Sequence, residues 1–172
     1  RGIKEQIGYK LTALLLYFEQ IPPNARWFLF GDDVEQDADV FTLFARVASG
    51  FRGAPLEQWL RTHRVSKKDI RVIMPLVERL PVVSDPVDAI FIHLERGRSP
   101  ESFGDDSVYP TKSYLQTAFV LAERGIIEEA AVGAVARDLR LRGVSDAELR
   151  SQADDALKRF SLSESVIELA FG

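Results

Sequence analysis

The sequence predicts an α/β fold in which a small parallel sheet with its covering helices is followed by a C-terminal helical bundle. Two apolar runs, over residues 26–30 and 88–94, have the length and composition of buried strands. Helical periodicities separate these two runs, and helices between strands are typical of a parallel sheet. After Pro110 only helical periodicities remain. We therefore expect an α/β core over residues 1–110 and a helical extension over residues 111–172.

The predicted core begins with a helix, a strand and a second helix. Apolar residues recur at helical spacing over residues 10–20, and two prolines that follow end this helix. The strand over residues 26–30 ends at Gly31, which permits a tight turn. A second amphipathic helix over residues 39–48 then returns the chain toward the sheet, as in a right-handed βαβ series.

A helical insert separates the two predicted strands. A short helix starts near Pro55, because proline is favoured in the first turn of a helix. Residues 66–69 read Ser-Lys-Lys-Asp, which is similar to a capping box, and they open a helix that runs to Leu80. Pro75 can bend or break that helix, because proline lacks a backbone N–H. After the second strand, residues 95–110 are polar and contain glycine and proline, which predicts a loop.

The segment after residue 110 has the periodicity of packed helices. We expect these helices over residues 114–122, 127–139, 145–160 and 163–171. Gly125 and Gly143 follow two of them as C-caps, and Ser145 with Glu148 forms a capping box for the third. Charged residues of both signs occupy the solvated faces of the helices. Their apolar faces can dock a partner or allow helix-mediated self-association.

Composition and charge limit the functions that this chain can have. The 172 residues are 46% apolar and 28% charged, an ordinary globular composition, and the formal net charge is −4. A nucleic-acid-binding protein normally has a surplus of basic residues, so we expect no nucleic-acid partner. The chain has no cysteine, which excludes disulfides and thiol nucleophiles and fits a cytoplasmic location. No apolar run approaches the ~20 residues that a transmembrane segment needs.

The first predicted strand leads directly into a group of acidic residues. Asp32, Asp33 and Asp37 follow the glycine that ends this strand, and open α/β sheets bind their ligands at the carboxyl ends of strands. Carboxylates forced together repel one another, so a cation stabilises them, and oxygen ligands suit Mg²⁺. The alternative is that Asp37 or Asp39 caps the helix that follows, as aspartate does at many helix N-termini. The residues alone leave both interpretations open.

The order of lysine, helix, strand and acidic loop resembles the C-terminal half of the catalytic core in the haloacid dehalogenase (HAD) superfamily. Those phosphohydrolases have a lysine at the start of a helix, then a strand, then a Gly-Asp-x(3–4)-Asp motif. In this chain Lys10 lies 21 residues before Gly31, and Asp37 completes the motif. The sequence looks most similar to the phosphatidate phosphatase branch of actin-patch and lipin-like enzymes, whose Asp-Pro-Glu-Ile-Tyr-like step is similar to residues 37–41.

The resemblance implies a partial Rossmann-like parallel sheet and a Mg²⁺-dependent phosphatase. In such an enzyme Asp32 would ligate Mg²⁺, and Asp37 would hold a metal-bound water or orient a ligand. Asp33 would either replace Asp32 as the ligand or stabilise the loop. Lys10 would be catalytic, because its ammonium group would offset charge near the nucleophile and the phosphoryl oxygens. Lys4 is a less well-spaced alternative. The substrate would be a phosphorylated small molecule or a lipid phosphate.

The nucleophile of that superfamily is absent from this sequence. It lies in an Asp-x-Asp-x-Thr/Val motif after the first strand of the core, and neither predicted strand here is followed by one. The chain begins at Arg1 and its only methionine is Met74, so we expect the nucleophilic half upstream in the same polypeptide. The alternative is a degenerate HAD-like pseudo-enzyme or a non-catalytic α/β-plus-helix interaction module. A second Gly-Asp-Asp sequence, at residues 104–106, has no apolar run before it and is interpreted as a solvated turn.

Overall fold

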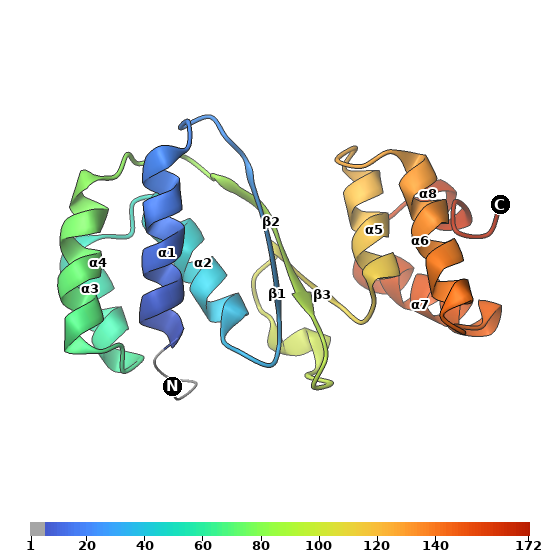
Figure 1. The fold of residues 1–172 in the computed structure, drawn as a ribbon, viewed down its shortest axis with the longest axis horizontal. Coiled ribbons are helices and arrows are strands. Elements are labelled where there is room, and N and C mark those ends of the chain that lie inside the picture. The colour runs from blue at the N-terminus through green and yellow to red at the C-terminus, as the bar shows by residue number, and fades with distance from the viewer. Residues whose placement is uncertain (1–5) are drawn as a thin grey trace. The chain divides into compact units, whose positions relative to one another are not determined.

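The computed structural model describes residues 6–172, and the chain divides into two compact units (Figure 1). Unit 1 comprises Arg1–Ile92 and Glu101–Val108. Unit 2 comprises His93–Pro100 and Tyr109–Gly172. Unit 1 and unit 2 each contain many buried apolar side chains, so each unit has its own hydrophobic core.

Three parallel strands form a sheet in the order β1-β2-β3, where the strands are β1 (Trp27–Asp32), β2 (Val87–His93) and β3 (Val108–Thr111). The Ile90 N–H donates to the Ser107 carbonyl oxygen at 2.9 Å. Four residues later the Leu94 N–H donates to the Thr111 carbonyl oxygen at 2.8 Å. The register is the same in both bonds, as parallel pairing requires. The prediction of an α/β fold with a small parallel sheet is therefore confirmed.

Three of the four residues of the third strand fall inside the segment 95–110 that the sequence predicts as a loop. β3 has four residues and contains Pro110, which cannot donate a hydrogen bond to a neighbouring strand. A short 3₁₀ helix, Pro100–Ser102, precedes it. The loop prediction for residues 95–110 is wrong at both places, because a strand this short is defined by its pairing with β2 and not by its own sequence.

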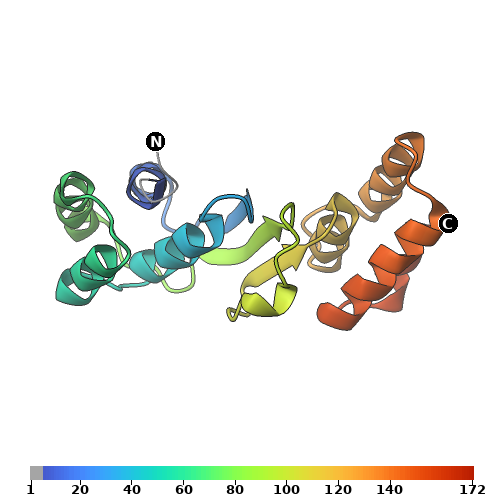
Figure 2. The same cartoon turned by 90° about the horizontal axis from the view of Figure 1, so that it is seen from below.

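The helices of unit 1 are α1 (Gln6–Gln20), α2 (Asp37–Ala48), α3 (Gly53–Thr62) and α4 (Lys67–Arg79). α1 contacts both α2 and α4, and Figures 1 and 2 show α3 and α4 side by side. α1 begins earlier than predicted, because Ile7 is buried and extends its apolar face. The Ser66 hydroxyl accepts the Asp69 N–H at 3.0 Å and caps α4 as expected. α4 continues through Pro75 without a break.

An aromatic cluster fixes β1 against the helices of unit 1. Phe18 of α1 lies edge-on to Phe44 of α2, with ring centroids 5.7 Å apart. The Trp27 ring of β1 lies 5.2 Å from Phe44 and 6.2 Å from Phe18. Such aromatic contacts add to the free energy gained by burying the rings. The cluster therefore fixes the amino end of β1, where Trp27 lies, against α1 and α2.

Unit 2 contains α5 (Tyr114–Glu123), α6 (Glu129–Leu141), α7 (Asp146–Arg159) and α8 (Glu164–Glu168). The predicted capping box is present, since the Ser145 hydroxyl accepts the Glu148 N–H and the Glu148 carboxylate accepts the Ser145 N–H. Gly125 and Gly143 have positive φ angles after α5 and α6, as C-cap positions require. The core of this unit is made by buried apolar residues of all four helices, among them Leu115, Phe119, Val132, Ala136, Leu149, Ala153 and Ile167.

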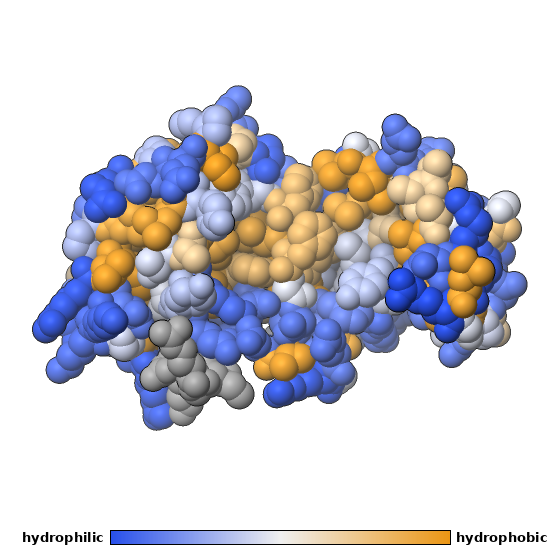
Figure 3. All heavy atoms as spheres, viewed as in Figure 1, coloured by the Kyte–Doolittle hydropathy of each residue, from blue (hydrophilic) through white to orange (hydrophobic). Residues whose placement is uncertain are grey.

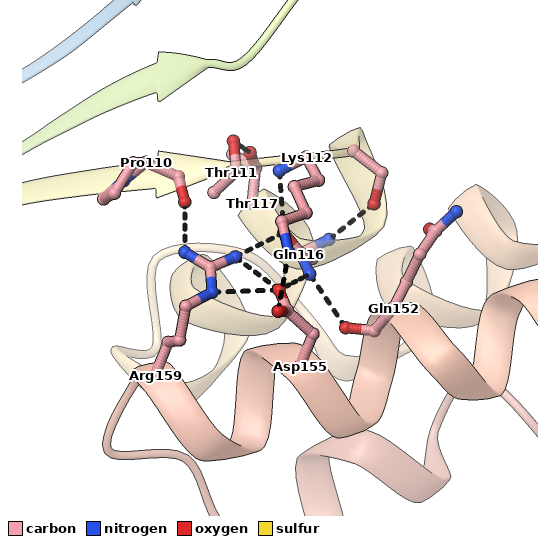
Figure 4. A network of polar contacts seen from close by, with 9 residues as sticks. Pro110, Thr111, Lys112, Gln116, Thr117, Gln152, Asp155 and Arg159 are labelled. Atoms are coloured by element: carbon pink, nitrogen blue, oxygen red, sulfur yellow. Dashed lines mark hydrogen bonds and ion pairs between the residues drawn. The ribbon is translucent and has the colours of Figure 1, made fainter. Parts of the chain in front are cut away.

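A buried polar network lies within unit 2 beside this core (Figure 4). Gln116 of α5 is fully buried, and its Nε2 donates to the Gln152 carbonyl oxygen and to Asp155 Oδ2, both at 2.8 Å. Its Oε1 accepts the Lys112 N–H at 2.7 Å and Arg159 Nη2 at 3.0 Å. The side-chain amide is therefore hydrogen-bonded at both ends, as a buried polar group requires.

The Asp155 carboxylate is the charged centre of this network. Arg159 donates to Asp155 Oδ2 from Nε at 2.9 Å and from Nη2 at 2.6 Å, and Lys112 Nζ donates to Oδ1 at 2.8 Å. Partial burial acts to raise the pKa of Asp155, but the hydrogen bonds from Arg159, Lys112 and Gln116 outweigh it and lower the pKa to about 2. Arg159 Nη1 also donates to the Pro110 carbonyl oxygen at 2.5 Å. Since its charges are paired within the network, we interpret this cluster as structural.

None of the helices in residues 6–172 has the length and apolar character needed to cross a membrane.

Figure 3 shows hydrophilic side chains over the end of unit 1 at which α3 joins α4, at the lower left of the view.

Candidate functional site

An acidic loop follows the carboxyl end of β1 and leads into α2. Gly31 allows this loop to close, because a Cβ atom at position 31 would lie 2.5 Å from both Cβ and Oδ2 of Asp37. The φ angle of Gly31 is not positive, so glycine is required here by the close approach of Asp37 and not by backbone conformation. Asp37, six positions along the chain, thus explains the glycine at position 31, one residue before the end of β1.

Asp32 organises the turn after the strand. Its Oδ1 accepts the Val34 N–H at 2.9 Å and the Glu35 N–H at 3.2 Å. Its own N–H donates to Asp37 Oδ2 at 3.2 Å. Asp32 Oδ2 has no hydrogen-bond partner within residues 6–172. The side chain therefore holds the loop with one oxygen and has a second oxygen that the loop does not use.

Lys10 of α1 reaches the same loop. Its ammonium group forms ion pairs with Glu35 and with Asp37, and Gln6, one helical turn earlier, donates from Nε2 to Glu35 Oε1 at 2.9 Å. Partial burial acts to lower the pKa of Lys10, but the hydrogen bonds and charges of Asp37 and Glu35 outweigh it and raise the pKa above its ordinary value. The hydrogen bonds from Lys10 and Gln6 lower the pKa of Glu35. Lys10 is therefore charged at neutral pH, and so is Glu35.

The helix that follows the loop is not capped by an aspartate. α2 begins at Asp37, and the residue before it, Gln36, makes no side-chain hydrogen bond to the helix. The interpretation of Asp37 or Asp39 as an N-cap is therefore wrong. Asp37 is 7% exposed and lies in the first helical turn, where its charge interacts favourably with the helix dipole. Asp39 is exposed.

The structure brings together Lys10, Asp32 and Asp37, and it buries Asp33, which is 8% exposed. Lys4 lies outside the described residues. Sequence analysis did not single out Glu35, although Glu35 pairs with Lys10 as Asp37 does. Gln6 was missed as well, and its place one helical turn before Lys10 is the signal that could have found it.

The donors of the loop suit a hard cation only in part. Within the described residues, no group of three or more His, Cys, Asp or Glu side chains is arranged to hold a metal ion. Both oxygens of Asp37 are engaged, one by Lys10 and one by the Asp32 N–H. Mg²⁺, however, usually takes one or two carboxylates and completes its shell with water and substrate phosphate. Asp32 Oδ2, at the end of β1, is a carboxylate oxygen of the type that such a shell uses.

Comparison of the chain with protein-family models, with curated proteins and with solved structures gave no match.

Proposed function

We propose that this chain supplies the acidic loop and the lysine of a Mg²⁺-dependent, HAD-like phosphohydrolase, with the nucleophilic aspartate on an upstream segment. The observation that supports the proposal best is the ion pair of Lys10 with Asp37. It joins a helix before the strand to the acidic loop after it, at the carboxyl end of a parallel strand. This is the position at which open α/β sheets bind their ligands.

In this proposal each residue of the loop, and Lys10 of α1, has a separate role. Asp32 binds Mg²⁺ through the oxygen that the turn does not use, and Asp33 stabilises the loop or shares the ion. Asp37 orients Lys10, and the ammonium group of Lys10 offsets negative charge on the phosphoryl oxygens. Mg²⁺ supplies Lewis-acid stabilisation of that charge when bound. The substrate class is a phosphorylated small molecule or a lipid phosphate.

A second candidate is a non-catalytic module, or a pseudo-enzyme that keeps the fold without the chemistry. The observation that favours it is the neutralisation of Lys10 by two carboxylates that already bind it. An ion-pair network of this kind also serves to fix a loop on a helix. In this case Asp32 has only the structural role of holding the turn.

Thermal denaturation with and without Mg²⁺ separates the two candidates. A Mg²⁺ concentration of ten times Kd stabilises a binding-competent fold by about 1.4 kcal/mol, which is about 6 °C for a unit of this size. We expect this shift in the wild-type chain and its loss in Asp32→Asn, which keeps the oxygen that accepts the two loop N–H groups. The matched control is Asp106→Asn, in the second Gly-Asp-Asp sequence, which should keep the shift.

The catalytic part of the proposal is tested on the polypeptide that includes the upstream segment. We expect Asp32→Asn to lower kcat for a generic phosphomonoester at least about 100-fold while the melting temperature without Mg²⁺ stays near that of the wild type. Retained activity in Asp32→Asn refutes the role of this residue. The lack of any Mg²⁺-dependent shift in the wild-type chain favours the non-catalytic candidate.

A further inference from the structure

A basic surface lies where α3 joins α4 in unit 1. Five basic residues fall within residues 61–71, and a single acidic residue, Asp69, lies among them, although the chain as a whole has a net charge of −4. The five are exposed, and they are Arg61, Arg64, Lys67, Lys68 and Arg71. In Figure 1 this connection lies at the lower end of α4. The distribution of charge therefore concentrates positive potential on one surface of unit 1, although the chain as a whole is acidic.

Nearby acids neutralise only one of the five basic residues of this surface. In the part of the chain that the structure describes, the side chains of Arg64, Lys67, Lys68 and Arg71 have neither a hydrogen bond nor an ion pair. Glu57 pairs with Arg61 alone. Asp69 accepts the Ser66 hydroxyl at 2.8 Å, and its side chain lies against Gly8 of α1. Four of the five basic groups therefore keep their charge available to a ligand from solution, and Arg61 is the exception.

A pocket of about 250 Å³ lies within this surface, lined by Glu57, Arg61, Lys67, Ile70 and Arg71. Three of these five residues are basic, and Lys67 is the first residue of α4. Ile70 is 6% exposed and contributes the apolar part of the lining. The lining residues thus include two arginines and a lysine, although the Arg61 guanidinium is paired with Glu57, and the site is large enough for a phosphate with a small organic part.

The backbone of the connection places an arginine where glycine is favoured. Arg64 has a φ angle of 59°, in the left-handed region. The Val65 N–H donates to the Leu60 carbonyl oxygen and the Arg64 N–H to the Arg61 carbonyl oxygen, both at 3.0 Å. This is the Schellman ending of a helix, and its left-handed position is usually glycine. Such a strained position is often tied to function, and here it adds one more unpaired cation beside the pocket.

We propose that this pocket binds the phosphate group of a small phosphorylated molecule or of inorganic phosphate. Guanidinium groups bind phosphate oxygens through paired N–H donors, and the lysine adds a point charge. The exposed basic side chains outside the pocket raise the local concentration of the anion. The inference is independent of the proposed phosphohydrolase function, because it uses no residue of the acidic loop and needs no Mg²⁺.

Amide NMR of the whole 172-residue chain tests the proposal, with inorganic phosphate and phenyl phosphate as probes at constant ionic strength. We expect saturable shifts of the amides of residues 61–71 and binding at least tenfold weaker in the double variant Lys67→Gln/Arg71→Gln. The matched control is Arg137→Gln/Lys158→Gln, which removes two exposed cations of unit 2 that also lack partners among residues 6–172. The control should bind both probes as the wild type does.

Three outcomes would overturn the proposal. The first is that neither probe shifts the amides of residues 61–71 at millimolar concentration, which would show that the pocket is not a phosphate site. The second is that the control pair weakens binding as much as the pocket pair, which would show that the effect is only one of net charge. The third is that vesicles with anionic lipids, or an oligonucleotide, bind at this surface while both soluble probes fail, which would assign the surface to a macromolecular partner.

Discussion

The polar network of unit 2 makes the stability of this protein depend on pH in a defined window. The pKa of Asp155 is about 2, against an ordinary value of 3.8, because its hydrogen bonds with Arg159, Lys112 and Gln116 favour the carboxylate over the effect of partial burial. A carboxyl group whose pKa is lowered by folding adds stability above its unfolded pKa, and this stability is lost as the pH falls toward the folded pKa. The window is therefore between pH 4 and pH 2.

The size of the effect follows from the shift. Each unit of pKa corresponds to about 1.4 kcal/mol, so the shift of Asp155 corresponds to about 2 kcal/mol. The side chain is 27% exposed, so solvent screening reduces this figure only moderately. We expect Asp155→Asn to lower the free energy of unfolding by about 2 kcal/mol at pH 7, and the difference from wild type to shrink toward zero near pH 2.

Urea denaturation followed by circular dichroism at several pH values between 2 and 7 measures this difference. The matched control is Asp154→Asn, which makes the same change at the neighbouring exposed position of α7. Comparing the two variants removes the contribution of the other carboxyl groups that titrate in the same range. A difference between Asp155→Asn and wild type that is independent of pH would refute the reasoning, and so would an equal effect of Asp154→Asn.

Three further substitutions test other parts of the structure by chemical denaturation. Gly31→Ala should destabilise unit 1 by about 1–3 kcal/mol, because the new methyl group overlaps the side chain of Asp37; a change below about 0.5 kcal/mol would contradict the close approach. Ser145→Ala should cost about 1 kcal/mol through loss of the capping box, and Ser151→Ala, on the exposed middle of the same helix, should cost less. Arg64→Gly should raise stability by about 1 kcal/mol, because it relieves the left-handed backbone, and should also weaken phosphate binding; lower stability would show that the arginine is not strained.

Features that depend on residues within one helical turn of each other could be predicted from the sequence. Ser66 and Ser145 cap their helices as expected, and Gly125 and Gly143 end theirs. The apolar runs of β1 and β2 lie within two residues of their predicted places. β2 is a mostly buried strand, as expected for a parallel sheet, but the expectation of a buried first strand is wrong, because only Leu29 of β1 is buried and Phe30 is 56% exposed. Helix caps and hydrophobic periodicities depend on residues that are close in the sequence, so they can be predicted from the sequence alone.

Elements that depend on distant partners were not readable in the same way. β3 is four residues long and contains a proline, so it exists as a strand only because β2 provides the pairing. In the acidic loop, the sequence shows several carboxylates, but it does not show which hydrogen-bond or ion-pair partner each carboxylate oxygen has. Glu35 lies 25 residues from Lys10, and the two meet only when α1 packs beside β1 and α2.

The sequence by itself determined an α/β protein with a small parallel sheet, a helical C-terminal segment and an acidic loop at the end of its first strand. The tertiary structure decided that Asp37 approaches the backbone of Gly31 and binds Lys10, and that the α3–α4 connection gathers unpaired cations around a pocket. The physical reason is the separation of the interacting residues along the chain. Local hydrogen bonds and hydrophobic periodicity select helices and strands, whereas contacts between ionic groups that are distant in the sequence depend on how those elements pack.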